Sequence, residues 1–354
     1  MGKTLKEKKQ VLLIGHYGRG NIGDEMMLRG IRRLMPDEVH LTVLGGEREK
    51  KLRQLFSGLR KSEWLWLGGG SMFHDLPKPV SRKYRSLLKM CMLTLLGKLF
   101  RLKVAWIGVG VGPLHTPLAK KMARFCLKQS SFRSVRDVES KNWIKDNGFE
   151  SKLTPDLALT DFQPKSIEPQ PSSFVLGVNI FPYHAIYHAE PDMDREWMDF
   201  LAATLKSLSE SGDVTLKLLS FSNKPTENDQ NALDYLAEKL GIAMIFQPEQ
   251  SIEAIQTCDG VLSMRYHASL VSAYLGKATI ALAYHPKCMV LDQALGLNQR
   301  SLMAWPAADT YELLKRHIHS MIEHPDAYRA VFQKAELQKQ LEENALPNLK
   351  GWER

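Results

Sequence analysis

Short apolar runs alternate with longer segments of helical period along most of the chain. In the first half these runs cover residues 11–15, 39–45, 64–68, 104–110 and 132–135. After a proline-rich segment at 162–173 the alternation restarts, with runs at 174–181, 213–221, 243–246, 260–264 and 278–284. Strand-like runs separated by helical segments predict parallel sheets that are covered by helices.

This pattern predicts two α/β domains. We expect a first Rossmann-like domain over residues 1–165, a second over 172–325, and a helical C-terminal tail over 326–354. In open parallel sheets, ligands bind beyond the carboxyl ends of the strands. Two such domains facing a cleft would therefore line it with strand ends, where we look for the chemistry.

Composition adds expectations about the cell compartment. The 354 residues are 44% apolar, enough for a large core, and the four cysteines show no CxxC pair or metal-ligand spacing. The N-terminus lacks the apolar core of a signal peptide, and the apolar runs are shorter than the roughly 20 residues needed to cross a bilayer. We expect a cytoplasmic protein with free thiols, no zinc and no membrane span.

The formal net charge of +9 is unevenly distributed. Residues 76–136 contain no Asp or Glu, and within them residues 81–103 interleave Lys and Arg with leucine and methionine. Such a segment is either a helix packed on a sheet with its lysines in solvent, or a basic amphipathic helix that lies on an anionic membrane. Because no nucleic-acid-binding motif is present, we expect no nucleic-acid partner.

A glycine-rich loop follows the first predicted strand. The segment GHYGRGNIGDEMM (15–27) has the GxGxxG spacing of dinucleotide-binding turns, but Asp24 and Glu25 stand where a pyrophosphate would meet the helix N-terminus, and they would repel it. Asp24 either caps a helix that starts near Glu25 or accepts a hydrogen bond or a proton from a substrate hydroxyl. A second loop, LGGGSMFHD (67–75), is either a tight turn or a place where backbone approaches a ligand.

Charged residues follow the ends of three further predicted strands. Arg136 comes before Asp137, a predicted helix N-cap, while Arg265 and His267 follow the run at 260–264 and Lys287 follows the run at 278–284. Arginine binds carboxylate and phosphate in a planar fork, and histidine moves protons near neutral pH. These four side chains predict a site for a small molecule with two or three negative charges.

Seven segments stand out over about 270 residues: GxGNIGDE (18–25), LGGGSMF (67–73), WIGVGVGPL (106–114), SVRDxES (134–140), TPDLAL (154–159), SMRYHASLVSAYLGKATIAL (263–282) and AYHPKCM (283–289). Their sequences and order resemble the polysaccharide pyruvyl transferase family. The family's usual RLH is here Arg265, Tyr266 and His267, and its YDPK is here Tyr284 to Lys287 with His285 in place of aspartate. The tyrosine leaves the charged pair intact, whereas no role is assigned to His285.

The resemblance implies a GT-B-like fold and a phosphoenolpyruvate donor, with a sugar residue as acceptor. The product would be a cyclic pyruvyl ketal bridging two hydroxyls, with release of phosphate. Arg136, Arg265 and Lys287 would bind the donor, His267 would act as acid and base near the enol, and Asp24 would deprotonate the attacking hydroxyl. Acceptor or backbone contacts are expected from Gly20, Asn21, Gly69, Gly70 and Ser71. Because side chains supply the cations, we expect neither a metal nor another cofactor.

By the same resemblance, the acceptor would be a cell-envelope glycan precursor, carried on a polyprenyl phosphate at the inner face of the cytoplasmic membrane. The basic segment 81–103 would then have a purpose as a peripheral membrane contact. Two other functions stay open at this point. One is a nucleotide-sugar-dependent glycosyltransferase of GT-B fold, and the other is a non-catalytic binding protein of the same fold.

Overall fold

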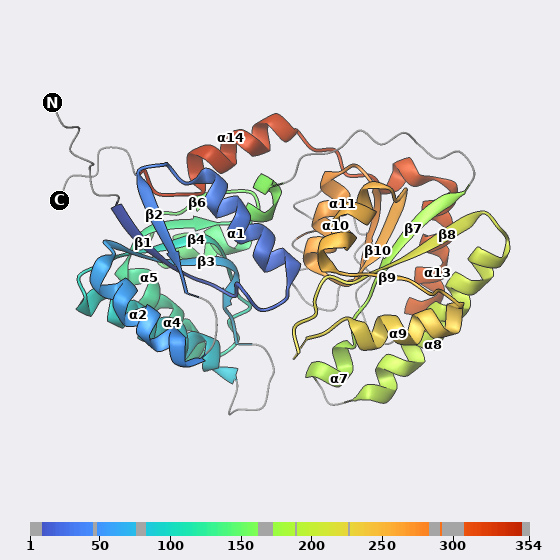
Figure 1. The fold of residues 1–354 in the computed structure, drawn as a ribbon, viewed down its shortest axis with the longest axis horizontal. Coiled ribbons are helices and arrows are strands. Elements are labelled where there is room, and N and C mark those ends of the chain that lie inside the picture. Colours follow the sequence, from blue (N-terminus) through green and yellow to red (C-terminus); the bar gives the residue numbers. More distant parts are fainter. Residues whose placement is uncertain are drawn as a thin grey trace. The chain divides into compact units, whose positions relative to one another are not determined.

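The chain divides into two compact units. The computed structural model describes residues 9–44, 48–75, 83–161, 173–187, 190–225, 227–282, 291 and 308–348. Within these ranges, the first unit contains residues up to Arg19, Asp24–Asp161 and the segment from Lys334 onward. The second unit contains Gly20–Gly23 and the described residues between Asp161 and Lys334. Each unit is an α/β domain with a parallel sheet, which confirms the predicted fold class (Figure 1).

The first unit is built on a six-stranded sheet of order β2-β1-β3-β4-β5-β6, in which every pair is parallel. Its strands are β1 (Lys9–Ile14), β2 (Val39–Val43), β3 (Trp64–Phe73), β4 (Lys103–Val111), β5 (Ser130–Val135) and β6 (Lys152–Leu153). Its helices are α1 (Ile22–Leu34), α2 (Arg48–Lys61), α4 (Arg85–Leu99), α5 (Pro117–Gln129), α6 (Val138–Asp146), the 3-10 turn η1 (Leu157–Asp161) and α14 (Lys334–Asn344).

The central strands of this sheet are apolar on both faces because helices cover both. Trp66 of β3 and Trp106 of β4 are fully buried, and the Trp106 ring stacks on Phe73 with centroids 4.1 Å apart. On one side the core receives buried side chains of α2, α4 and α5, among them Leu59, Leu87 and Cys126. This is the two-faced burial that near-continuous apolar runs predict.

The C-terminal helix α14 belongs to the first unit. The Asn344 side chain donates to the Leu153 carbonyl at 3.1 Å, and the buried Ser134 hydroxyl donates to the Ala345 carbonyl at 2.7 Å. These bonds connect the helical tail to β6 and β5.

The second unit has a five-stranded parallel sheet of order β11-β10-β7-β8-β9. Its strands are β7 (Phe174–Asn179), β8 (Val214–Leu219), β9 (Ile245–Phe246), β10 (Gly260–Ser263) and β11 (Ala278–Ala281). Its helices are α7 (Tyr183–Tyr187), α8 (Pro191–Glu210), α9 (Gln230–Leu240), α10 (Pro248–Gln256), α11 (Tyr266–Tyr274), α13 (Ala308–Glu323) and the 3-10 turn η2 (Pro325–Tyr328). The order reverses between β7 and β10, the kind of position where open sheets bind ligands.

The glycine triplet is not a loop, contrary to the tight turn considered from the sequence. Strand β3 continues through it as far as Phe73, and Gly69 and Gly70 adopt φ of 75° and 83° inside the strand. These left-handed values are open to glycine at little cost. The glycines therefore kink the strand end and bring Ser71 next to β4, since Ser71 pairs with Gly110.

Two polar contacts fix the start of α5. Thr116 caps the helix by accepting from the Ala119 N–H at 3.2 Å. The buried Asp75 carboxylate accepts from the N–H of His115 at 2.6 Å and from the N–H and hydroxyl of Thr116 at 2.8 and 2.7 Å. Burial opposes ionisation of Asp75, but these hydrogen bonds outweigh it and hold its pKa below the usual value.

Among the described residues, no helix is long and apolar enough to span a membrane.

We expect Asp75→Asn to lower the free energy of unfolding by about 1–3 kcal/mol at pH 7, because hydrogen bonds to an ionised group are lost. Since the folded-state pKa is depressed, this contribution is complete above the unfolded-state value of about 3.9 and disappears as the pH falls through the folded-state pKa. Urea denaturation at a series of pH values should show the two proteins converging in acid. The exposed Asp37→Asn should behave as wild type, and a gap that persists in acid would contradict this account.

Candidate functional site

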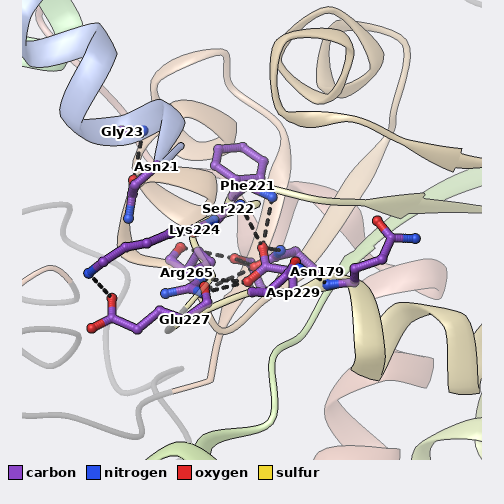
Figure 2. A network of polar contacts seen from close by, with 12 residues as sticks. Asn21, Gly23, Asn179, Phe221, Ser222, Lys224, Glu227, Asp229 and Arg265 are labelled. Carbon is purple, nitrogen blue, oxygen red and sulfur yellow. Dashed lines mark hydrogen bonds and ion pairs between the residues drawn. The ribbon is translucent and has the colours of Figure 1, made fainter. Parts of the chain in front are cut away.

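Arg265 lies at the carboxyl end of β10 and forms the N-cap position of α11. Its guanidinium donates to one oxygen of Asp229, from Nε at 2.8 Å and from Nη2 at 2.6 Å, and Nη2 also donates to the Glu227 carbonyl at 2.6 Å. The planar group lies 4.1 Å from the centre of the Phe181 ring. Only 8% of the Arg265 side chain is exposed, so this network fixes its position (Figure 2).

The carboxylate of Asp229 is fully buried and organises three strand ends. Its second oxygen accepts from the N–H groups of Phe221 and Ser222 at 2.7 and 3.0 Å, and from the Asn179 side chain at 3.2 Å. Burial raises the pKa of Asp229, while the Arg265 guanidinium and these hydrogen bonds oppose the rise. The charge of this carboxylate therefore depends on its arginine partner.

Asn179, the last residue of β7, completes the connection. Its side-chain oxygen accepts from the Arg265 N–H at 3.0 Å and from the Ser263 hydroxyl at 3.2 Å, and its amide donates to the Leu219 carbonyl at 2.8 Å. The ends of β7, β8 and β10 are thus joined where the sheet order reverses. Asn179 was not among the predicted site residues, although a polar residue at the end of a buried strand is a signal in the sequence that could have found it. Asp229 lies in a polar stretch and gave no such signal.

His267 lies in the first turn of α11 and is half-buried against the segment Gly20–Gly23. A Cβ atom on Gly23 would fall 1.9 Å from the His267 Nδ1, so only glycine leaves room for the imidazole. This segment is held by the strand-end loop, because Ile22 donates to the Phe221 carbonyl at 3.0 Å and Asn223 donates to the Gly20 carbonyl at 2.9 Å. Figure 2 shows Asn21 and Gly23 of this segment together with the Arg265 network of the same unit.

The start of α1 corrects one expectation about Asp24. Helix α1 begins at Ile22, and the side chain of Asn21 accepts from the Gly23 N–H at 3.0 Å. Asp24 therefore lies inside the first turn and does not cap the helix. A carboxylate in that turn is favoured by the helix dipole. The other interpretation of Asp24, as an acceptor for a substrate hydroxyl, stays a prediction.

In the first unit, Arg136 follows β5 and is also held by a buried carboxylate. Its Nη1 donates to Asp156 at 2.8 Å and its Nη2 donates to the Ser71 hydroxyl at 2.9 Å, with 5% of the arginine and 2% of the aspartate side chain exposed. The predicted capping role of Asp137 is confirmed, since it accepts from the Ser140 N–H at 2.7 Å. Asp156 belongs to the TPDLAL segment but had no role assigned from the sequence.

Carboxylates gather near the glycine-rich end of β3. The Tyr17 hydroxyl donates to the Gly68 carbonyl at 2.8 Å. Burial raises the pKa of Tyr17 well above its usual value, and the negative charges of Asp24, Glu25 and Asp156 add to the rise. A Cβ on Gly70 would lie 3.8 Å from an oxygen of Asp24, which places this carboxylate close to the kinked strand end.

The predicted site residues thus divide into two groups and a remainder. Asp24, Gly69, Gly70, Ser71 and Arg136 lie together in the first unit, and Gly20, Asn21, Arg265 and His267 lie together in the second. Lys287 and His285 lie outside the described residues. That the two groups face one cleft stays a prediction. Among the residues that the structure describes, no cluster of three or more His, Cys, Asp or Glu could hold a metal ion.

Comparison with known proteins identifies the class. The model of the family described as polysaccharide pyruvyl transferase matches residues 21–286, a span that includes every residue of the two groups except Gly20. The chain belongs to the polysaccharide pyruvyl transferase family, as its motifs predicted. No curated protein matches the chain in sequence.

Three solved structures share the GT-B-like fold, with its two Rossmann-like domains. The complex of S. aureus MnaA with UDP has a TM-score of 0.56 at 9% identity, covering 95% of this chain and 92% of that one. UDP-GlcNAc 2-epimerase from Neisseria meningitidis bound to UDP-GlcNAc has a TM-score of 0.56 at 11% identity, covering 94% and 97%. A putative UDP-N-acetylglucosamine 2-epimerase from Listeria monocytogenes has a TM-score of 0.51 at 11% identity, covering 92% and 100%. These similarities show the fold alone.

Proposed function

We propose that the protein transfers the pyruvyl group of phosphoenolpyruvate to two hydroxyls of a sugar residue in a cell-wall or exopolysaccharide precursor. The products are a cyclic ketal and inorganic phosphate, and no cofactor is needed besides the donor substrate. The observation that carries the proposal is the fixed pair of Arg265 and His267 at a strand end, inside the region that matches the family.

In this proposal, Arg265 and Arg136 hold the phosphate and the carboxylate of the donor, together with Lys287. The Asp229 and Asp156 carboxylates position the two guanidinium groups. Because these carboxylates offset the arginine charges, donor recognition depends more on short hydrogen bonds from the guanidinium groups than on the net charge of the site. The first turn of α11 adds partial positive charge from its N–H groups, which favours an anion beside His267.

The proposed chemistry begins with a proton transfer from His267 to carbon 3 of the enol. Carbon 2 then becomes electrophilic, and one sugar hydroxyl adds to it as its proton passes to Asp24. The bond from carbon 2 to the phosphate oxygen breaks with its electron pair on phosphate, and the arginines stabilise the charge that develops there. The second hydroxyl adds to carbon 2, passes its proton to the His267 imidazole that lost one in the first step, and closes the ketal.

The test is phosphate release from phosphoenolpyruvate across glycosides of N-acetylmannosamine, galactose, glucose and glucuronic acid. A polyprenyl-phosphate-linked acceptor would be added to the panel, since we also propose that the natural acceptor is lipid-linked at the inner membrane face. Acceptor-dependent phosphate release, with a pyruvyl ketal in the product, is expected. If the protein instead releases a nucleotide from a sugar nucleotide and no phosphate from phosphoenolpyruvate, the result would favour the glycosyltransferase. Binding of glycan with no turnover of either donor would favour the non-catalytic protein.

A further inference from the structure

One face of the first unit exposes an unusual concentration of apolar side chains. Helices α2, α4 and α5 lie on the same side of the sheet and share one core beneath them (Figure 1). Twelve large apolar side chains are exposed among the described residues, and eight of them are on these three helices. Scattered exposed leucines are normal, but a concentration on one face marks an interaction site.

Helix α4 carries the centre of this face. Leu88, Met92, Leu95 and Leu99 follow one side of the helix at spacings of four, three and four, and they are 54–74% exposed. The opposite side is buried against the sheet through Leu87, Met90 and Leu93 among others. The helix is therefore apolar on two sides, although only one of them packs within the unit. The packed-helix interpretation of residues 81–103 explains the inner side alone; residues 81 and 82 lie outside the described residues.

The neighbouring helices extend the apolar stripe on both sides. On α5, Leu118 and Phe125 are 51% and 38% exposed, and on α2, Leu52 and Phe56 are 60% and 43% exposed. The Phe56 ring lies 6.4 Å from that of Phe100, which directly follows α4. The exposed apolar side chains therefore form one face over three helices, and we call it the α2–α4–α5 face.

The charged side chains that the structure describes on this face have one sign. Helices α4 and α5 contain no Asp or Glu, and their exposed cations include Arg85, Lys98, Lys120, Lys121 and Arg124. Lys121 comes three residues after Leu118 and four before Phe125, so it shares their side of the helix. On α2 a hollow of about 550 Å³ is lined by Leu52, Arg53, Phe56, Ser57, Arg60 and Lys61. Three cations here surround two apolar side chains.

We propose that the α2–α4–α5 face binds the surface of an anionic lipid bilayer. Apolar side chains at this density fit the boundary of headgroups and acyl chains, and the surrounding Lys and Arg match anionic headgroups. A second copy of this chain fits less well, because a two-fold interface would bring cation against cation with no carboxylate on α4 or α5. Nucleic acid would match the cations and leave the exposed leucines without a partner. The proposed membrane contact therefore includes α2 and α5 as well as α4.

Flotation of the full-length protein with vesicles tests this proposal without using phosphoenolpyruvate, so its outcome is independent of the proposed function. Vesicles of phosphatidylglycerol and phosphatidylcholine should bind the protein, and vesicles of phosphatidylcholine alone should bind it far less. The triple variant Lys120→Gln, Lys121→Gln, Arg124→Gln should bind about 100-fold more weakly, because each cation near a charged surface contributes about one kcal/mol. High salt should weaken binding of the wild type.

A second variant tests the apolar side chains by combining Leu95→Gln with Leu99→Gln, at positions where the leucines are 60% and 74% exposed. This double variant should also bind at least about 100-fold more weakly. Met244→Gln and Val331→Ser in the second unit, which are 53% and 94% exposed, are the matched controls and should bind as wild type. The proposal is wrong if anionic vesicles fail to float the protein or if the face variants float as well as the controls. If the protein does not bind vesicles but forms dimers, and the leucine variants dissociate those dimers, the face would be assigned to a second copy of the chain.

Discussion

Replacing His267 by alanine should lower kcat for phosphoenolpyruvate-dependent phosphate release by about 10²–10⁴-fold, the usual contribution of a positioned general acid. The proposed reaction needs a proton at carbon 3 before any sugar hydroxyl can add, and without the imidazole that proton must come from water. Because the ring is half-buried in the first turn of α11 and Arg265 is held separately by Asp229, KM for the donor should change much less. Steady-state phosphate release on a working acceptor measures both parameters.

Two further variants separate catalysis from folding. His319→Ala, on the exposed side of α13, should keep full activity. Gly23→Ala leaves His267 in the sequence but places a Cβ 1.9 Å from its Nδ1, so the imidazole must move. This variant should lose most of the same kcat while calorimetry still shows a folded protein. Full activity of His267→Ala would refute the proposed mechanism and move the acid to another group.

The fold could be predicted from the sequence because strands such as β1, β3, β4 and β10 are buried along most of their length on both faces. The runs at 11–15 and 260–264, for example, fall on β1 and β10, with the boundaries displaced by one or two residues. The two-residue strand β6 has no apolar run of its own, so the alternating pattern does not predict it. The glycine triplet was assigned to a turn or a ligand loop because glycine usually ends a strand, whereas the pairing of β3 with β4 overrides that preference here.

The site could be predicted only in part. Arg136 and Arg265 stand immediately after apolar runs and His267 follows Arg265 by two residues, so their position near strand ends follows from the local pattern. The carboxylates that hold the arginines do not follow from it, because Asp229 is 36 residues from Arg265 and Asp156 is 20 residues from Arg136. Such pairs depend on the packing of loops, which no local periodicity encodes.

The two buried arginine–aspartate pairs depend on the same balance between desolvation and electrostatic attraction. A buried guanidinium is costly to desolvate, and its carboxylate compensates for that cost only with good geometry. Such a pair is weak evidence for added stability, but it fixes where the planar group lies. In both units the arginine follows a strand and the carboxylate comes from a loop, so the sheet and the ion pair together set the position of each guanidinium. Substitution of the carboxylate should reveal how much of the site depends on this arrangement.

Asp229→Asn should lower the free energy of unfolding by about 3–5 kcal/mol, because it leaves the Arg265 charge buried without its partner. The amide oxygen can still accept from the N–H groups of Phe221 and Ser222, so the loss reports mainly on the charge. Calorimetry and urea denaturation measure it. Asp199→Asn, which removes the carboxylate of the half-exposed pair with Lys239, is the matched control and should cost no more than about 1 kcal/mol.

The double variant Arg265→Met, Asp229→Asn distinguishes a structural ion pair from a functional one. With no buried charge left unpaired, it should recover most of the stability that Asp229→Asn loses. In a double-mutant cycle, the stability losses of the two single variants should therefore not add up to that of the double variant, and the difference measures the coupling between Arg265 and Asp229. Its activity should stay lost, because methionine cannot hydrogen-bond the donor. If the double variant regained both stability and phosphate release, Arg265 would be a structural residue and the proposed donor contact would be wrong. If neither single variant lost stability, the buried pair would not govern the position of the guanidinium at all.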